Sequence, residues 1–282
     1  MLAIGERLNG TRKKVAQALL DRDEAYVRQE VLRQLEGGAM MIDINGGTTP
    51  EQEADNLRWL AQVVGTHCGA PVCIDSANGS LMPDAIEAWL RANKGAIPGH
   101  FELRPGVPWL LLNSITADQA RYELLLPLIV KYRCAVVALC LGGGEPSADA
   151  QVRIGKGTEL VERLLADGIE PQRIYVDPLV MPLGVDPGNG LAATQVIQVL
   201  KERFPGLRTV CGLSNVSFGL PLRGLLNRTF LTMLIGAGLD AAVMDTSDRE
   251  LMSSLHAAVA LCGRDEYCSG YIAAFRSNRL TV

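Results

Sequence analysis

Eight short apolar runs recur along the chain, and each of them ends in a polar residue. The runs span 2–7, 39–45, 71–76, 109–115, 135–141, 173–179, 209–215 and 241–247. Runs that are apolar at nearly every position are typical of strands buried on both faces of a parallel sheet. The stretches between them have helical periodicity, as in 51–64, where Leu57, Leu60 and Val64 share one helix face.

This regular alternation of strand and helix strongly constrains the fold. Eight consecutive strand–helix units favour an α/β fold of the closed (β/α)8 TIM-barrel type over an open sheet. The chain has 282 residues, and such barrels commonly run to about 250 residues as one unit. We therefore expect a single barrel domain over 1–282.

Composition excludes several classes of function. The 27 Lys and Arg residues against 31 Asp and Glu residues give a net charge of −4, so no basic excess is present to hold a nucleic-acid backbone. No apolar run reaches the roughly 18–20 residues that a membrane span needs, and the first residues do not resemble a secretory signal. The seven cysteines form no CxxC pair and no Cys/His cluster, which predicts free thiols in a cytoplasmic protein.

Two stretches rich in Gly and Pro interrupt the alternation. The first, 94–107, follows a helix, so we expect it at the amino-terminal end of the barrel, as an insertion with a role in assembly. The second, 142–156, follows the carboxyl end of a strand. Functional sites of such barrels are built at that end, so this stretch is expected to act as a mobile cover.

In a barrel, polar residues at the carboxyl ends of the strands share one mouth. Those residues are Glu6, Asn9, Asp43, Asn45, Asp75, Asn78, Asn113, Asp177, Asn215 and Asp245. The set holds carboxylates and carboxamides but no His, Lys or Cys, which argues against Schiff-base chemistry, a catalytic triad or a His-rich metal centre.

Carboxylates and carboxamides at these positions suit a planar heterocycle such as a pterin. A buried carboxylate accepts paired hydrogen bonds from adjacent N–H groups, and Asn both donates and accepts. Two other interpretations stay open. Asp43, Asp75, Asp177 and Asp245 would also suit a divalent cation, and any one Asp or Asn after a strand can simply cap the next helix. The recurrence of the same chemistry at five or more strand ends favours a ligand.

Several motifs together resemble those of the pterin-binding methyltransferases. They are GERLNG (5–10), GGAMMIDINGG (37–47), CIDSANG (73–79), LLNSIT (111–116), YVDPLVMP (175–182), CGLSNVSFGLP (211–221), LLNRTF (225–230) and GLDAAVMD (238–245). The resemblance covers nearly the whole chain. It implies a barrel, usually dimeric, that moves a methyl group between tetrahydrofolate and the cobalt of a corrinoid protein. The implied substrates are tetrahydrofolate and 5-methyltetrahydrofolate, with the cobalamin carried by a partner protein.

The resemblance also implies roles for individual residues. Asn215 contacts N5, the atom that carries the methyl group, and is the implied catalytic residue. Asp75, Asn113 and Asp177 hold the pterin ring, and the supporting groups are Asp43, Ser214 and Arg223. The amide of Asn215 can donate to N5 or accept from it, so it serves transfer in both directions.

The chain departs from the family pattern after the NVS triplet, where relatives often have polar residues. Here Phe218, Gly219 and Leu220 follow, and we expect an apolar wall that shields the reacting methyl group and cobalt from water. This departure favours transfer from the methylcorrinoid to tetrahydrofolate, as in demethylation pathways. The opposite direction, as in acetyl-CoA synthesis, stays open.

Three alternative functions differ in what they require. Dihydropteroate synthases share the strand-end pattern but use a basic cluster late in the chain, which 214–224 lacks. Methionine synthase contains a similar pterin barrel, but its zinc cysteines and cobalamin loop have no counterpart here, so the cobalt must arrive on another protein. A non-catalytic folate-binding protein would keep the barrel without methyl transfer.

Overall fold

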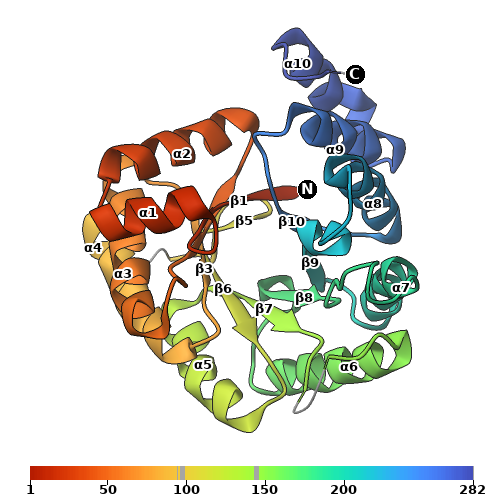
Figure 1. Ribbon diagram of the computed structural model, residues 1–282. Coiled ribbons are helices and arrows are strands. Elements are labelled where there is room, and N and C mark those ends of the chain that lie inside the picture. Colours follow the sequence, from red (N-terminus) through yellow and green to blue (C-terminus); the bar gives the residue numbers. More distant parts are fainter. Residues whose placement is uncertain (94, 96–98, 143–145, 282) are drawn as a thin grey trace.

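A computed structural model describes residues 1–93, 95, 99–142 and 146–281. Eight parallel strands form a closed barrel in the order β1-β10-β9-β8-β7-β6-β3-β2, with helices around its outside (Figure 1). The strands are β1 (Leu2–Asn9), β2 (Met41–Asn45), β3 (Val72–Asp75), β6 (Leu110–Ile115), β7 (Ala135–Leu139), β8 (Ile174–Asp177), β9 (Arg208–Gly212) and β10 (Ala241–Met244). The predicted TIM barrel is confirmed.

Helices follow the strands, and four of them begin at an Asp whose side chain caps the first turn. They are α1 (Lys13–Asp21), α2 (Glu24–Gly37), α3 (Pro50–His67), α4 (Met82–Ala92), α5 (Gln119–Tyr132), α6 (Ala150–Ala166), α7 (Asn189–Arg203), α8 (Arg223–Ala237), α9 (Arg249–Leu261) and α10 (Ser269–Arg276). The side chains of Asp23, Asp118, Asp149 and Asp248 each accept a backbone N–H in the first turn of the helix that follows. None of the helices within the described ranges combines the length and apolarity that crossing a membrane requires.

The strands are buried on both faces, which explains why the runs are apolar at nearly every position. Met41 and Leu111 point into the barrel with Tyr175, whereas Ile42 and Leu112 pack outward beneath the helices. The inward positions near the carboxyl ends are the exception, because Asp43 and its counterparts on other strands are polar. The barrel is therefore filled by side chains at one end and hollow at the other.

The segment before β6 closes the filled end. Its described part forms a hairpin of β4 (Glu102–Arg104) and β5 (Val107–Pro108). Val107 is fully buried among the inward side chains of the barrel, and Glu102 pairs with Arg208 at the start of β9. The expected location at the amino-terminal end is confirmed. The hairpin has an internal packing role there, and the assembly role stays a prediction; residues 94 and 96–98 lie outside the described residues.

Two of the predicted segments, 209–215 and 142–156, differ from the structure at their ends. The run 209–215 ends as a strand at Gly212, because 213–217 form the 3-10 turn η3 (Leu213–Ser217). The proposed cover 142–156 includes 143–145, which lie outside the described residues, and from Ala150 onward it is the helix α6. The expected loop is therefore much shorter than predicted. All seven cysteines are free.

Candidate functional site

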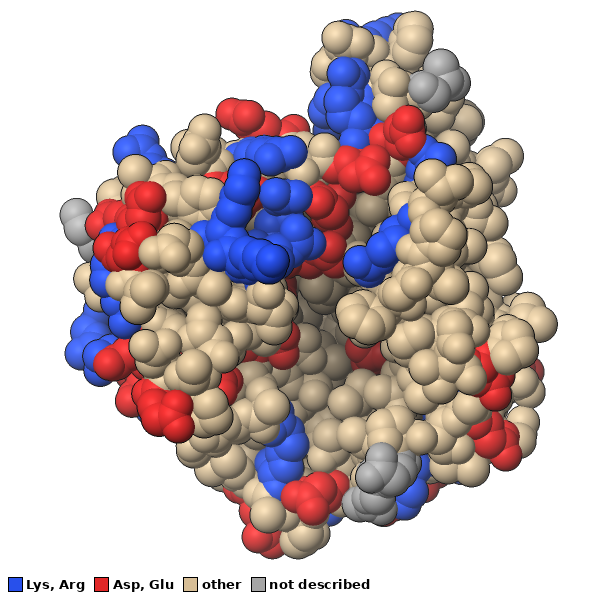
Figure 2. All heavy atoms as spheres, viewed as in Figure 1, with Lys and Arg blue, Asp and Glu red and all other residues tan. Residues whose placement is uncertain are grey.

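A cavity of about 860 Å³ opens at the carboxyl ends of the strands. The space-filling view looks into this hollow, with acidic side chains on its walls (Figure 2). The predicted site residues that line it are Asp43, Asp75, Asn113, Asp177, Ser214 and Asn215. Glu6, Asn9 and Asn45 line it as well. The barrel thus brings together strand ends that are far apart in the sequence.

Asp43, Asp75 and Asn113 lie on three consecutive strands of the barrel wall. Strand register places Asp43 beside Cys73 and Asp75 beside Asn113. Asn45 donates its Nδ2 hydrogen to Asp75 Oδ2 at 2.9 Å. Asp43 is only 2% exposed, and its Oδ1 has no hydrogen-bond partner among the described residues. A buried carboxylate oxygen without a partner is costly, so this oxygen is available to a hydrogen-bond donor of a ligand.

The buried carboxyl groups of the cavity have raised pKa values. Burial raises the pKa of Asp43 well above its usual range, and the charge of Asp75 raises it further. Burial also raises the pKa of Asp75 and brings the pKa of Asp177 to about 7, although the Leu179 N–H and the Arg153 charge oppose that shift. Asp177 can therefore either donate or accept a proton in a hydrogen bond near neutral pH.

Asp177 ends β8 and is fixed by the backbone that follows it. Its Oδ1 accepts the N–H of Leu179 at 2.8 Å. Leu179 itself has φ of 58°, a left-handed conformation that is unusual for a side chain of this kind. The second oxygen of Asp177 is left to face the cavity, because the turn takes up only the first.

Ser214 and Asn215 lie in η3, directly after β9. Asn215 is exposed to the cavity, and its side chain forms no hydrogen bond within the described part of the chain. It lies against Gly212, where an added Cβ would come within 3.0 Å of Asn215 Nδ2. Gly212 therefore leaves the space that the amide needs.

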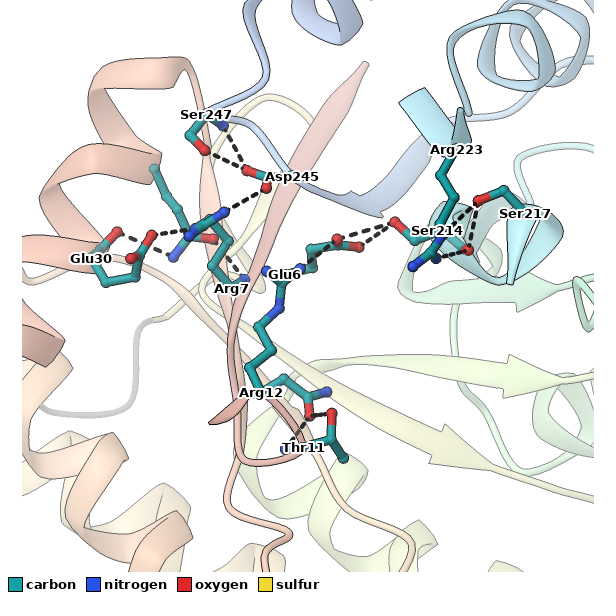
Figure 3. A network of polar contacts seen from close by, with 12 residues as sticks. Glu6, Arg7, Thr11, Arg12, Glu30, Ser214, Ser217, Arg223, Asp245 and Ser247 are labelled. Carbon is teal, nitrogen blue, oxygen red and sulfur yellow. Dashed lines mark hydrogen bonds and ion pairs between the residues drawn. The ribbon is translucent and has the colours of Figure 1, made fainter. Parts of the chain in front are cut away.

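Arg223 does not line the cavity. It is exposed at the start of α8, and it donates from Nη2 to the Ser214 carbonyl at 2.7 Å and from Nε to Ser217 Oγ at 3.0 Å (Figure 3). The arginine thus holds the turn that carries Ser214 and Asn215. Direct contact with a pterin is not what this position provides.

Glu6 and Asp245, both predicted at strand ends, have different surroundings (Figure 3). Glu6 accepts Ser214 Oγ with both carboxylate oxygens, at 2.9 and 3.0 Å, and pairs with Arg12 Nη2 at 2.9 Å. Asp245 lies outside the cavity lining, where it pairs with Arg7 at 2.7 Å. Burial works to raise the pKa of Asp245, but hydrogen bonds from Ser247 and Arg7 outweigh it and hold the pKa below the usual value.

Asn78 is a capping residue, which is the alternative role of any Asp or Asn that follows a strand. Its Oδ1 accepts the backbone N–H of Ser80 at 3.1 Å and the Ser80 hydroxyl at 2.7 Å. Asn78 is not among the residues that line the cavity. This strand-end residue therefore organises the start of η1 (Gly79–Leu81), which leads into α4.

Arg121 is a cavity residue that the sequence did not single out. It donates from Nε to the Ser114 carbonyl at 2.6 Å and from Nη2 to the Ser76 carbonyl at 2.9 Å, and it also contacts the Ala77 carbonyl. These bonds tie the ends of β3 and β6 together. The sequence contained one signal for this role, because Arg121 lies three residues after Asp118, the N-cap of α5. The first turn of that helix passes back over the strand ends.

The alternative of a divalent cation lacks its ligands. Among the residues that the structure describes, no group of three or more His, Cys, Asp or Glu side chains is arranged to hold a metal ion. Asp245, one of the four acids in that alternative, is turned toward Arg7. The remaining acids are distributed around the cavity wall, which suits a ligand larger than an ion.

Comparison with known proteins adds the decisive observation. Residues 5–245 match the family model described as pterin binding enzyme. The chain belongs to the pterin-binding enzyme family. Over 284 aligned residues it is 34% identical to the methylcorrinoid:tetrahydrofolate methyltransferase of Eubacterium limosum, covering 99% of this chain and 98% of that protein.

More distant relatives agree with this assignment. The chain is 26% identical to a methionine synthase of Mycobacterium tuberculosis over 259 residues, which are 88% of this chain and 20% of that protein. Among solved structures, the 7,8-dihydropteroate synthase of Vibrio fischeri superposes with a TM-score of 0.65 at 14% identity, covering 95% of this chain and 94% of that one. A dihydropteroate synthase of Yersinia pestis gives 0.61 at 18% identity, over 93% and 94%. These structural likenesses show the shared barrel fold.

Proposed function

We propose that this pterin-binding enzyme transfers a methyl group from a separate methylcorrinoid protein to N5 of tetrahydrofolate. The observation that carries the proposal is the convergence of Asp75, Asn113, Asp177 and Asn215 on one open cavity. Full-length similarity to a protein named for this reaction supports it. The reverse direction, from methyltetrahydrofolate to cobalt, uses the same groups.

The cavity fits a pterin ring in its hydrogen-bonding chemistry. A pterin presents a ring N–H beside an exocyclic amine, and a carboxylate accepts both at once. The free Oδ1 of Asp43 and the cavity-facing oxygens of Asp75 and Asp177 supply acceptors. Asn113 offers both a donor and an acceptor to the ring edge. We assign these four residues to binding and orientation of the pterin.

Asn215 is assigned to the reacting end of the pterin. Its amide is exposed on the open side of the cavity and is free of other hydrogen bonds in the described residues. An amide does not titrate, so it can follow N5 through its change of charge by exposing either the N–H or the carbonyl. An interaction that strengthens as N5 changes charge stabilises the transition state more than the ground state.

The transfer itself is an in-line displacement. The N5 lone pair attacks the methyl carbon, the carbon–cobalt bond breaks, and its electron pair stays on cobalt, which goes from cobalt(III) to cobalt(I). Holding N5 in line with that bond is the main task of the protein, because orientation alone is worth several kcal/mol in such reactions. The open mouth leaves room for a corrin to approach.

Three further properties belong to the proposal. The corrinoid is carried by a separate protein, in keeping with similarity to a protein named methylcorrinoid:tetrahydrofolate methyltransferase. The enzyme acts as a homodimer, as the family resemblance implies. We place it in the cytoplasm, in keeping with seven free cysteines.

The function is tested by mixing the protein with methylcob(III)alamin and tetrahydrofolate, and separately with cob(I)alamin and 5-methyltetrahydrofolate, while the cobalt spectrum is followed. We expect interconversion of the two cobalt states with matching conversion of the folate. Repeating both mixtures with a corrinoid protein controls for weak reaction of the free cofactor. Folate binding without transfer in either mixture would favour a non-catalytic binding protein, and formation of dihydropteroate from a pterin diphosphate would favour the synthase alternative.

A further inference from the structure

Glu6 is a carboxylate of the cavity that pterin binding leaves unassigned. It lies on β1, and its two oxygens accept the hydroxyl of Ser214 at 2.9 and 3.0 Å. Ser214 precedes Asn215 in η3, and both residues line the cavity. Glu6 is therefore connected, through one hydroxyl, to the turn that carries the group assigned to N5 (Figure 3).

Methyl transfer to tetrahydrofolate releases a proton from N5, which an acceptor has to take up. N5 of tetrahydrofolate carries one hydrogen, and after it attacks the methyl carbon it bears four bonds and a positive charge. Neutral 5-methyltetrahydrofolate forms only when the N5–H bond breaks and the proton leaves. Asn215 cannot take that proton, because a carboxamide has no usable basicity.

We propose that Glu6 takes the N5 proton through the hydroxyl of Ser214. This inference rests on the proposed methyl transfer. Ser214 Oγ accepts the proton from N5 while its own proton passes to the Glu6 carboxylate, so one N–H bond breaks and one carboxyl O–H bond forms. The proton then leaves to solvent at the open mouth. In the reverse direction the same path delivers a proton to N5 before the methyl group departs.

The surroundings of Glu6 suit a group that gains and loses a proton. Burial raises its pKa, and Asp245 acts in the same direction. The Ser214 hydrogen bond, Arg12 and Arg223 oppose this effect, but the net direction is upward. Asp43 lies on the neighbouring strand β2, and the charge of Glu6 contributes to the raised pKa of Asp43. A carboxylate with a raised pKa is a better base than a solvent-exposed one.

The other acids of the site are less suited to this role. Asp177 Oδ1 is held by the Leu179 N–H, and Asp75 Oδ2 by the Asn45 amide. Neither forms a hydrogen bond to Ser214, whose hydroxyl goes to Glu6. Asp245 faces Arg7 outside the cavity lining. Asp43 also lines the cavity, with Oδ1 free of partners in the described residues, but the Ser214 hydroxyl is bonded to Glu6.

The test compares Glu6→Gln with Glu51→Gln, which removes the same charge from an exposed position on α3. We expect Glu6→Gln to lower kcat for methyl transfer to tetrahydrofolate about 100-fold, with the tetrahydrofolate Kd unchanged. The wild-type rate should rise with pH as the carboxylate loses its proton, and Glu6→Gln should abolish that rise. Glu51→Gln should behave as wild type.

Ser214→Ala provides an independent variant, because it removes the relay and keeps the acid. We expect a similar loss of kcat, and a Glu6→Gln/Ser214→Ala double variant no slower than either single variant, since both changes break one path. Circular dichroism and tetrahydrofolate binding show that each variant is folded.

Three results would overturn the inference. They are a Glu6→Gln enzyme with wild-type kcat, a slower Glu6→Gln enzyme that keeps the wild-type pH profile, and a Ser214→Ala enzyme with unchanged kcat and profile. In each case the wild type still transfers methyl groups, so the proposed function stands. A wild type that transfers no methyl group with any corrinoid contradicts the proposed function itself.

Discussion

At the scale of single residues, the site depends on which polar atoms the fold leaves without partners. Asp43 Oδ1 has no partner among the described residues, and the Asn215 amide is equally uncommitted. Arg223, Asn78 and Asp245 have their hydrogen bonds satisfied by the protein. Asp43 and Asn215 are therefore available to a ligand, whereas the other three residues stabilise the loops around the site.

We predict that Asn215→Ala lowers turnover more than folate affinity. In the proposed mechanism the amide contacts N5, where charge changes during transfer, so its loss is expected to affect the transition state more than the bound substrate. We expect kcat to fall about 100-fold or more, with less than about a threefold change in tetrahydrofolate Kd. Single-turnover kinetics and equilibrium binding measure the two quantities. An Asn215→Ala enzyme with unchanged turnover would remove this residue from the mechanism.

Gly212→Ala tests the same amide through its neighbour. The new Cβ would lie 3.0 Å from Asn215 Nδ2, so the side chain has to move while its chemistry is kept. We predict a fall in kcat of about tenfold, since a displacement of this size costs one to two orders of magnitude in positioning. Gly219→Ala is not a suitable control because its φ is positive, whereas Gly155→Ala, with no atom within 4 Å of the added Cβ, should leave kcat unchanged.

Asp177 links the site to stability. Its pKa rises from 3.8 to about 7 on folding, so between these values the folded protein binds a proton that the unfolded chain does not. The contribution of Asp177 to the free energy of unfolding is therefore most favourable at low pH and declines as pH rises toward 7. Asp177→Asn removes this decline. As pH rises from 4 to 8, we expect the free energy of unfolding of the variant to increase relative to that of the wild type by up to about 4 kcal/mol.

Urea unfolding of both proteins across this pH range measures that difference. The other buried acids are common to both proteins, and Asp75, whose charge raises the pKa of Asp177, is the one whose own titration the substitution also changes. The same substitution should weaken tetrahydrofolate binding about 10- to 100-fold. A stability difference that is constant with pH would mean that Asp177 stays ionised in the folded protein.

At the scale of elements, sequence periodicity predicted all eight barrel strands because each is buried on both faces. Its boundaries were wrong where apolar residues continue past the strand, as at Leu213, which is buried in a 3-10 turn. The hairpin β4–β5 was missed because its strands are only three and two residues long. The hydrogen bond between Glu6 and Ser214 joins residues 208 positions apart, and no local pattern in one sequence reports such a contact.

The hairpin is expected to support stability without affecting the site. Val107 is fully buried at the filled end of the barrel, whereas Leu103 in the same hairpin is 51% exposed. We predict that Val107→Ala lowers the free energy of unfolding by about 1–3 kcal/mol, and that Leu103→Ala changes it by less than about 0.5 kcal/mol. Both variants should keep the wild-type kcat when folded, because the cavity lies at the opposite end; a loss of activity in folded Val107→Ala would show coupling between the two ends.

At the scale of the whole molecule, the cavity has acidic walls, and exposed apolar side chains follow the turn that carries Asn215. Phe218 is 68% exposed and Leu222 80% exposed, both within eight residues of Asn215. Phe218 is therefore not a core residue, and its ring adds nothing to the packing of the barrel. A large apolar side chain next to a site that must admit a second molecule is expected to contact that molecule.

If the methyl group arrives on a corrinoid protein, Phe218 lies where the two surfaces meet. We predict that Phe218→Ala raises KM for the methylated corrinoid protein about tenfold, which corresponds to about 1.4 kcal/mol of lost apolar burial, while KM for tetrahydrofolate stays unchanged. Phe275→Ala is the matched control, because Phe275 is 71% exposed but lies on α10, which projects from the barrel beside α9 (Figure 1). Equal KM values for wild type and Phe218→Ala would place the approach of the corrinoid elsewhere around the cavity, with Arg12, Lys13 and Lys14 at the start of α1 as the next residues to test.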